Sequence, residues 1–182
     1  MRRIMVIGGA GAGKSTFARA LGDRLGLPAV HLDSLYWEAG WVEAEEAVFL
    51  DRVERAVAGD AWVMDGNYSR TWPMRLARTD TLVFLDVAMP VRLIRVFRRW
   101  LRYRGRTRPD LALGCEERLP DRAFLDWIMR YRLRGRPKAL ALMAAAPSHI
   151  ACHHLRGSAA AARFVDELPA LARPAQPVSL RA

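Results

Sequence analysis

Short apolar runs alternate along the chain with longer segments in which apolar residues recur every three or four positions. The short runs predict β-strands and the longer periodic segments predict helices. The predicted strands cover residues 3–7, 29–32, 62–65, 81–86 and 149–154. The predicted helices cover residues 14–25, 44–58, 90–102, 121–134, 137–145 and 159–172. Because strands and helices alternate, we expect an α/β fold with a parallel sheet and helical crossover connections.

One segment interrupts this alternation. Residues 103–115, "YRGRTRPDLALGC", contain Gly105, Pro109 and Gly114 between two predicted helices. Glycine and proline at this density predict an excursion that is mobile and outside the core. We therefore expect one domain over residues 1–172 with a small lid at about 103–118. Residues 173–182, with two prolines, are expected to form a flexible tail.

The first predicted strand runs directly into "GGAGAGKS", which fits the phosphate-loop pattern G-x-x-x-x-G-K-[ST]. Glycines allow consecutive backbone N–H groups to turn toward an anion, and the following helix adds its positive N-terminal end. Lys14 supplies a compact charge to the β- and γ-phosphates, and the Ser15 hydroxyl is a ligand for Mg²⁺. The residues expected to hold ATP are Gly8, Gly9, Ala10, Gly11, Ala12, Gly13, Lys14, Ser15 and Thr16. The alternative is a glycine-rich turn with a chance lysine.

Aspartates stand at the ends of three predicted strands, where ligands gather in parallel sheets. Asp65, followed by Gly66, is placed to assist Mg²⁺ and the substrate. Asp33 is placed to accept a proton from an acceptor hydroxyl or to bind the acceptor by hydrogen bonds. Aspartate also commonly caps turns after strands, and for Asp86 this structural role is the favoured interpretation.

Two further side chains are candidates for binding the acceptor. Arg70 is able to clamp a phosphate or carboxylate in a bidentate manner, although a solvated surface arginine explains it almost as well. Trp37, with Tyr36 and Trp41 beside it, offers an aromatic wall. Packing of a small subdomain is the slightly favoured alternative for these aromatic residues.

The charge of the chain is concentrated in one segment. The formal net charge is +10, and 27 of the 29 basic residues are arginine. Residues 92–136 carry 14 arginines and five acids, so this segment is expected to face an anion. The arginines of helix 90–102 share one face: Arg92, Arg95, Arg99 and Arg102. The excursion adds Arg104, Arg106 and Arg108, which a closing lid brings to the transferred phosphoryl group. The alternatives are a solvated basic face and a nucleic-acid-binding patch.

Other features place the chain in a broad class. Cys115 and Cys152 have no metal-ligand spacing, which favours reduced thiols in a cytoplasmic protein. The longest apolar stretch, residues 139–146, is too short to cross a membrane, so no membrane partner is expected. The three histidines of residues 149–154 lack further residues that would complete a ligand set.

With the phosphate loop, "HLD", "DGNYSR", "FLDVAMPVRLIRVFRR" and "YRGRTRPD" in this order, residues 3–170 resemble the adenylate-kinase-like small P-loop kinases. They resemble most closely the bacterial group labelled DNA topology modulation protein. The resemblance implies a P-loop three-layer sandwich whose five strands lie in the order 2-3-1-4-5. It also implies ATP on the phosphate loop, Mg²⁺ near Asp65, an acceptor phosphate on Arg70, and catalytic arginines at Arg95 and Arg99. Nucleoside monophosphate kinases read D-G-F-P-R where this chain reads "DGNYSR", which moves the arginine by one position.

Two hypotheses follow. The favoured one is an ATP- and Mg²⁺-dependent kinase acting on a nucleoside, a nucleotide or a small metabolite. Its catalytic residues are expected to be Lys14, Asp33, Arg95 and Arg99. The alternative is a nucleotide-gated protein that binds nucleic acid or regulates DNA topology through the basic segment. Nucleic-acid binding of that kind weakens steeply as salt rises.

Overall fold

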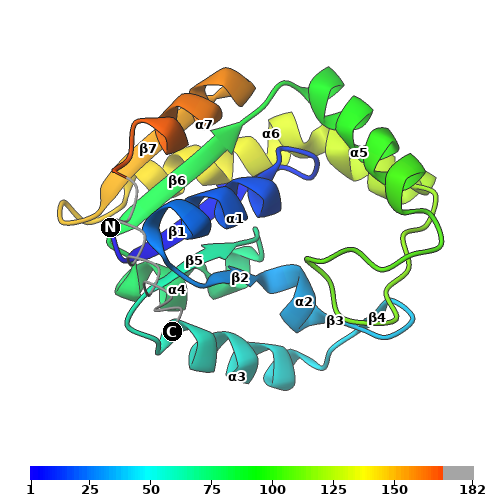
Figure 1. The fold of residues 1–182 in the computed structure, drawn as a ribbon, viewed down its shortest axis with the longest axis horizontal. Coiled ribbons are helices and arrows are strands. Elements are labelled where there is room, and N and C mark those ends of the chain that lie inside the picture. The colour runs from blue at the N-terminus through cyan, green and yellow to red at the C-terminus, as the bar shows by residue number, and fades with distance from the viewer. Residues whose placement is uncertain (170–182) are drawn as a thin grey trace, which may run out of the picture.

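The computed structural model describes residues 1–169 and has a five-stranded parallel sheet at its centre (Figure 1). The sheet order is β2-β5-β1-β6-β7, and each neighbouring pair is parallel. The strands are β1 (Arg3–Gly8), β2 (Ala29–His31), β5 (Trp62–Asp65), β6 (Thr81–Asp86) and β7 (Ala151–Arg156). Counted in chain order within this sheet, the strands lie as 2-3-1-4-5. The predicted α/β fold is therefore confirmed.

Helices cover both faces of the sheet, which produces three layers (Figure 1). One face packs against α1 (Lys14–Leu25) and α7 (Gly157–Asp166). The other packs against α3 (Glu46–Val57), α4 (Trp72–Arg78) and α6 (Arg122–Ala144). Side chains of β1 alternate between the two cores, so Ile4 and Val6 face α1 whereas Met5 and Ile7 face the opposite layer. The burial of β1 on both faces explains its continuous apolar run.

Several predicted boundaries differ from the observed ones. The separate helices predicted over 121–134 and 137–145 are wrong, because α6 continues through Pro137. Proline removes one helical hydrogen bond, but both halves of α6 are anchored by buried side chains, among them Ile128 and Ala139. The last strand begins two residues later than predicted, in register with β6 from Ala151. The predicted helix 159–172 is wrong at residues 167–169, because α7 ends at Asp166. Its last residues and the predicted tail 173–182 lie outside the described residues.

Short elements between β2 and β6 were not predicted. They are α2 (Leu32–Tyr36), the hairpin strands β3 (Trp37–Glu38) and β4 (Val42–Glu43), a 3-10 turn η1 (Ser69–Thr71) and helix α4, which follows it. Elements of two to seven residues carry too little periodicity to be recognised in a sequence. They matter because they surround the carboxyl end of the sheet.

The lid segment, residues 103–118, follows α5 (Met89–Tyr103) and packs against the β3–β4 hairpin (Figure 1). Gly40 N–H donates to Gly114 O at 2.9 Å, and Trp41 Nε1–H donates to Glu116 O at 2.6 Å. Cys115 is fully buried in this contact. The expectation that this excursion stays outside the core is therefore wrong for part of it, because the contact with the hairpin shields its centre from solvent.

Asp86 at the end of β6 joins three elements. Its Oδ2 accepts hydrogen bonds from Arg136 on α6 (2.9 Å between Nη2 and Oδ2) and from His154 on β7 (2.9 Å). Burial would raise the pKa of Asp86, but these hydrogen bonds outweigh it and hold the pKa below its usual value. The geometry supports the structural interpretation of this residue.

We expect Asp86→Asn to reduce the free energy of unfolding by about 1–3 kcal/mol near neutral pH, since charge-assisted bonds are lost. The folded-state pKa of Asp86 is lowered, so its contribution is present above the unfolded value of 3.8 and is lost as pH falls through the folded value. Urea unfolding from about pH 7 down to about pH 3 measures this. The difference in free energy of unfolding between wild type and variant should become smaller toward about pH 3. A difference that does not change with pH would contradict the structural role of Asp86.

Candidate active site at the phosphate loop

The loop between β1 and α1 has the geometry of an anion-binding site. Gly13 precedes α1 with φ 93°, a left-handed conformation that glycine adopts without strain. The helix begins at Lys14, so the backbone N–H groups of its first turn have no helical partner. These N–H groups, together with the positive end of α1, form a site for phosphate.

Helix α5 packs against this loop and donates hydrogen bonds to its carbonyl groups. Arg92 donates to Ala10 O (3.4 Å) and to Ile128 O (2.9 Å), and Arg95 donates to Ala12 O (3.0 Å). A Cβ at Gly11 would lie 2.4 Å from the carbonyl oxygen of Arg92. The loop therefore requires glycine for packing against α5 as well as for approach of a ligand. Arg95, predicted to be catalytic, is held by this loop carbonyl and by the Ser158 hydroxyl.

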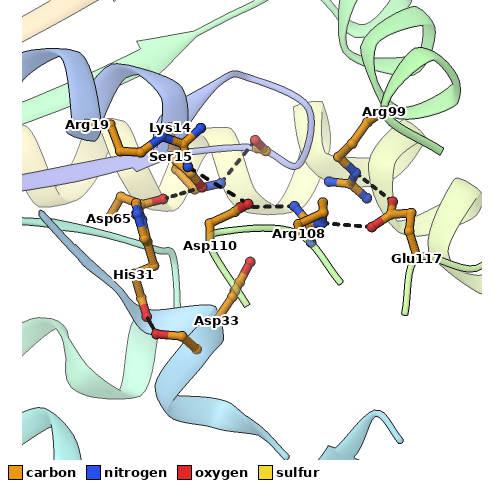
Figure 2. Close-up of polar contacts among 12 residues, drawn as sticks. Lys14, Ser15, Arg19, His31, Asp33, Asp65, Arg99, Arg108, Asp110 and Glu117 are labelled. Atoms are coloured by element: carbon orange, nitrogen blue, oxygen red, sulfur yellow. Dashed lines mark hydrogen bonds and ion pairs between the residues drawn. The ribbon is translucent and has the colours of Figure 1, made fainter. Parts of the chain in front are cut away.

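Lys14 lies at the centre of the carboxyl end of the sheet (Figure 2). Its Nζ donates to Gly9 O at 3.3 Å. Burial lowers the pKa of Lys14, while the carboxylates of Asp33 and Asp65 raise it in part. A half-buried ammonium with a single hydrogen bond to the protein is suited to an anionic ligand.

Ser15 and Asp65 meet beside Lys14. Ser15 Oγ–H donates to Asp65 Oδ2 at 3.0 Å, although 50 residues separate them in the chain. The other carboxylate oxygen of Asp65 contacts His31 Nδ1. A hydroxyl and a buried carboxylate at the phosphate loop provide the oxygen ligands that Mg²⁺ prefers, so the residues predicted to hold the metal fit this role.

Asp33 lies in the first turn of α2, and its Oδ1 accepts a hydrogen bond from the Tyr68 hydroxyl at 2.8 Å. Burial and the neighbouring Asp33 carboxylate raise the pKa of Tyr68, so the hydroxyl remains a donor at neutral pH. This bond fixes one carboxylate oxygen of Asp33 and leaves the other for a different partner.

The segment after β5 is tied to the phosphate loop. Asn67 Oδ1 accepts a hydrogen bond from Gly8 N–H at 3.0 Å. Arg75, fully buried, donates to Gly66 O at 3.0 Å, and burial lowers its pKa to about 9. A Cβ at Gly66 would lie 2.7 Å from Leu32 Cβ, so this glycine allows β2 and β5 to approach at their ends.

Arg70 and Trp37 are held by protein contacts. Arg70 pairs with Glu46 at 3.1 Å and lies over the rings of Tyr36 and Phe49, each centroid 5.1 Å away. The ring of Trp37 packs edge-on against Tyr36, at 5.0 Å between centroids. These contacts support the alternative in which the aromatic residues pack a small subdomain.

The lid segment brings charged side chains toward the phosphate loop (Figure 2). Arg108 pairs with Asp110 (3.0 Å) and with Glu117 (2.7 Å), and Glu117 also accepts from Arg99 Nε at 2.7 Å. Glu117, with 4% of its surface exposed, thus holds one arginine of α5 and one of the lid. Arg104 and Arg106, predicted to act with Arg108, lie exposed on the surface.

Asp110 connects the lid segment to α1. Its Oδ1 lies 4.0 Å from Nη1 of Arg19. Burial would raise the pKa of Asp110, but the charge of Arg108 and the Ser15 hydroxyl hold it below its usual value. The lid therefore stands over the phosphate loop in this structure, with a charged carboxylate facing Ser15.

Sequence reasoning missed several residues of this site. His31 and Tyr68 stand within the segments "HLD" and "DGNYSR", but neither received a role. Asp110 and Glu117 were counted only as acids within a basic segment. A buried carboxylate among many arginines is a signal for an internal ion-pair network, yet burial cannot be read from charge alone.

For a site that transfers phosphate, Glu117→Gln is expected to slow the transfer by about 10- to 100-fold, because Arg99 and Arg108 lose the charge that positions them. The affinity for ATP should change little, since the phosphate loop is intact. Steady-state ADP release and ATP titration measure the two effects. Glu116→Gln, an exposed neighbour with the same charge change, is the matched control. Equal activity of both variants would contradict this role for Glu117.

Comparisons with known proteins support the fold. No protein-family model matches the chain, and no curated protein sequence matches it. Among solved structures, a shikimate kinase from Acinetobacter baumannii in complex with shikimate has a TM-score of 0.58 and 17% identity, covering 91% of this chain and 89% of the other. This similarity shows that the two chains share the same α/β fold.

Two looser matches have TM-scores below 0.5, and no inference is drawn from them. A sugar kinase from Janibacter sp. HTCC2649 has 17% identity and a TM-score of 0.47, covering 86% and 85% of the two chains. A shikimate kinase from Bacteroides thetaiotaomicron has 20% identity and a TM-score of 0.46, covering 91% and 97%. Within residues 1–169, the structure contains no helix with the length and apolar character needed to cross a membrane.

Proposed function

We propose that this protein is an ATP-dependent phosphotransferase that moves the γ-phosphate of ATP to a small acceptor. One observation carries the proposal. The hydroxyl of Ser15 donates to the carboxylate of Asp65 beside the half-buried Lys14, at the N-terminus of α1. This combination of an anion-binding loop, a compact cation and two oxygen ligands matches what phosphoryl transfer from a nucleotide requires.

Each group has a role in holding the donor. The backbone N–H groups of residues 9–15, except that of Ala12, which donates to Gly9 O, and the Lys14 ammonium bind the β- and γ-phosphates. Ser15 and Asp65 would hold Mg²⁺, which neutralises negative charge on the phosphates when it is bound. His31 orients Asp65 through its contact with the second carboxylate oxygen.

The acceptor side is assigned to Asp33. In the transfer, an acceptor hydroxyl oxygen forms a bond to the γ-phosphorus, the bond from that phosphorus to the β–γ bridging oxygen breaks, and ADP leaves. Asp33 takes the proton of the hydroxyl, and Tyr68 holds Asp33 in place. Arg99 and Arg108, fixed by Glu117, stabilise the charge that spreads over the transferred oxygens.

The alternative, a nucleotide-gated nucleic-acid-binding or topology-modulating protein, needs arginines that face outward. Four of the arginines in the basic segment are engaged within the protein: Arg92, Arg95, Arg99 and Arg108. These four arginines serve the site that the kinase proposal requires, whereas exposed arginines of the segment, such as Arg104 and Arg106, face outward as the alternative requires. A duplex-DNA titration tests it, since backbone binding should weaken steeply with added salt.

Two measurements in sequence test the proposal. Calorimetry with ATP and with GTP, each in the presence of magnesium, should detect binding of one or both nucleotides. Transfer of labelled γ-phosphate to a panel of nucleosides, nucleotides and small metabolites should then identify the acceptor. Absence of any nucleotide affinity would refute the proposed function.

A further inference from the structure

A cavity of about 490 Å³ lies between the segment after β5 and the middle of α6. Its volume is within the range of small-molecule sites. Four aromatic side chains line it: Tyr68, Trp72, Trp127 and Tyr131. Trp127 is about half exposed, which is unusual for the largest apolar side chain and places a flat surface at the cavity wall. The cavity is therefore suited to a ring.

The charged residues around this cavity are mostly basic. Arg70, Arg130, Arg134 and Lys138 line it together with a single acid, Asp126. Arg70 is paired with Glu46, and Arg130 with Asp126. Within residues 1–169, neither of the other two cations has an ion-pair partner.

These two cations, Arg134 and Lys138, are four residues apart on α6 and so lie on one face of the helix. Like charges in this arrangement repel each other, and an anion between them removes that repulsion. Both side chains are exposed to solvent, so an anionic ligand in the cavity can reach them. The cavity therefore has an aromatic portion and a cationic portion without an ion-pair partner within residues 1–169.

The cavity also adjoins the phosphate loop. Asn67, in its wall, accepts the hydrogen bond from Gly8 N–H. Tyr131 stacks on Arg92, which braces the loop (4.8 Å from the guanidinium carbon to the ring centroid). Tyr68 donates to Asp33. Three wall residues thus contact the loop, its brace or the proposed base, so one layer of side chains connects a ligand in the cavity to the reacting groups.

We infer that this cavity binds the acceptor, and that the acceptor carries both a ring and a carboxylate or phosphate group. The ring packs among the aromatic side chains, and the anionic group pairs with Arg134 and Lys138. The role of this ligand as phosphate acceptor rests on the proposed function. Binding of the ligand itself, an anion that carries a ring, requires neither ATP nor phosphate transfer. Two classes of compound carry both a ring and such an anionic group: aromatic carboxylates and nucleoside monophosphates.

Binding titrations without ATP test the inference. The probes are 4-hydroxybenzoate and AMP, with 4-hydroxybenzamide and adenosine as their uncharged counterparts. Tryptophan fluorescence and calorimetry record binding to the full chain. At least one anionic probe should bind about tenfold or more tightly than its uncharged counterpart, as expected for hydrogen bonds to charged groups. Binding of 4-hydroxybenzoate would indicate an aromatic carboxylate as the acceptor, and binding of AMP would indicate a nucleoside monophosphate.

A matched pair of variants locates the site. Arg134→Gln with Lys138→Gln should weaken the binding of the anionic probe by about tenfold or more. Arg122→Gln with Arg132→Gln removes the same charge from exposed positions of the same helix and should leave binding unchanged. Trp127→Phe should reduce the fluorescence response, with Trp72 supplying the remainder, while calorimetry still detects the probe; an unchanged response would place the probe elsewhere.

The inference is overturned if neither anion binds at millimolar concentration, if charge makes no difference, or if both double variants bind alike. A different experimental result would show that the proposed function is wrong while this inference holds. A protein that binds the anionic probe in this cavity but has no affinity for ATP or GTP would retain the binding site and lose the kinase assignment.

Discussion

Replacing Lys14 with alanine is expected to abolish ATP turnover, with a loss of at least about 10²- to 10³-fold, while the fold is retained. Removal of one preorganised charge from a phosphoryl-transfer site has an effect of this size. The fold should survive because Lys14 contributes a single long hydrogen bond, to Gly9 O at 3.3 Å. Burial already disfavours its charged form, as its lowered pKa indicates. The variant should therefore unfold at the same or a higher temperature than the wild type.

ADP release, ATP calorimetry and thermal unfolding of the same preparation measure these effects. Lys14→Arg keeps the positive charge but replaces the compact ammonium with a planar guanidinium group, so its turnover should be little higher than that of Lys14→Ala. Arg132→Ala removes an exposed cation on α6 and serves as the control that leaves turnover unchanged. Retained turnover in Lys14→Ala would remove the central assignment.

Asp33→Asn is expected to lower the rate of transfer by about 10²- to 10⁴-fold, the range for loss of a general base. The amide has nearly the same shape as the carboxylate, and its oxygen still accepts the bond from the Tyr68 hydroxyl. The affinity for ATP should change far less, because the phosphate loop does not depend on Asp33. Measurement of kcat with the identified acceptor, beside ATP titration, separates the two quantities.

Tyr68→Phe provides the matched comparison, since it removes the hydroxyl that orients Asp33 and keeps the carboxylate. We expect a smaller fall in kcat than for Asp33→Asn, again with ATP binding preserved. If Asp33→Asn weakens ATP binding as much as it slows transfer, the residue is structural and the acceptor role is lost.

The elements with strong periodicity were predictable. The strands over 62–65 and 81–86 and the helix over 14–25 match the structure at both ends. Apolar side chains in these segments face a single core or lie in a fully buried strand, so the local pattern and the tertiary environment agree. The helix break at Pro137 was mispredicted, because burial of side chains on both sides of the proline opposed the local preference.

The candidate site was predictable where one loop or one strand end determines it. Ser15 and Asp65 were expected near each other because the carboxyl ends of neighbouring parallel strands meet at one edge of the sheet, and the structure places them 3.0 Å apart. By contrast, the sequence could not predict which arginines would be buried in ion pairs and which would be exposed. Arg92, Arg104 and Arg108 have the same chemistry in the sequence, yet one braces the phosphate loop, one is exposed and one is buried with Glu117.

The sequence by itself determined the layered α/β fold and the phosphate loop, since both depend on residue spacing within about 20 positions of the chain. Only the tertiary structure decided which charges pair and which residues surround the cavity between the segment after β5 and α6. Those outcomes depend on segments that are distant in the chain and meet after folding, such as Glu38 with Cys115 and Asn67 with Gly8. Burial then sets the strength of each charge interaction, because the same ion pair is weak in water and strong where solvent is excluded.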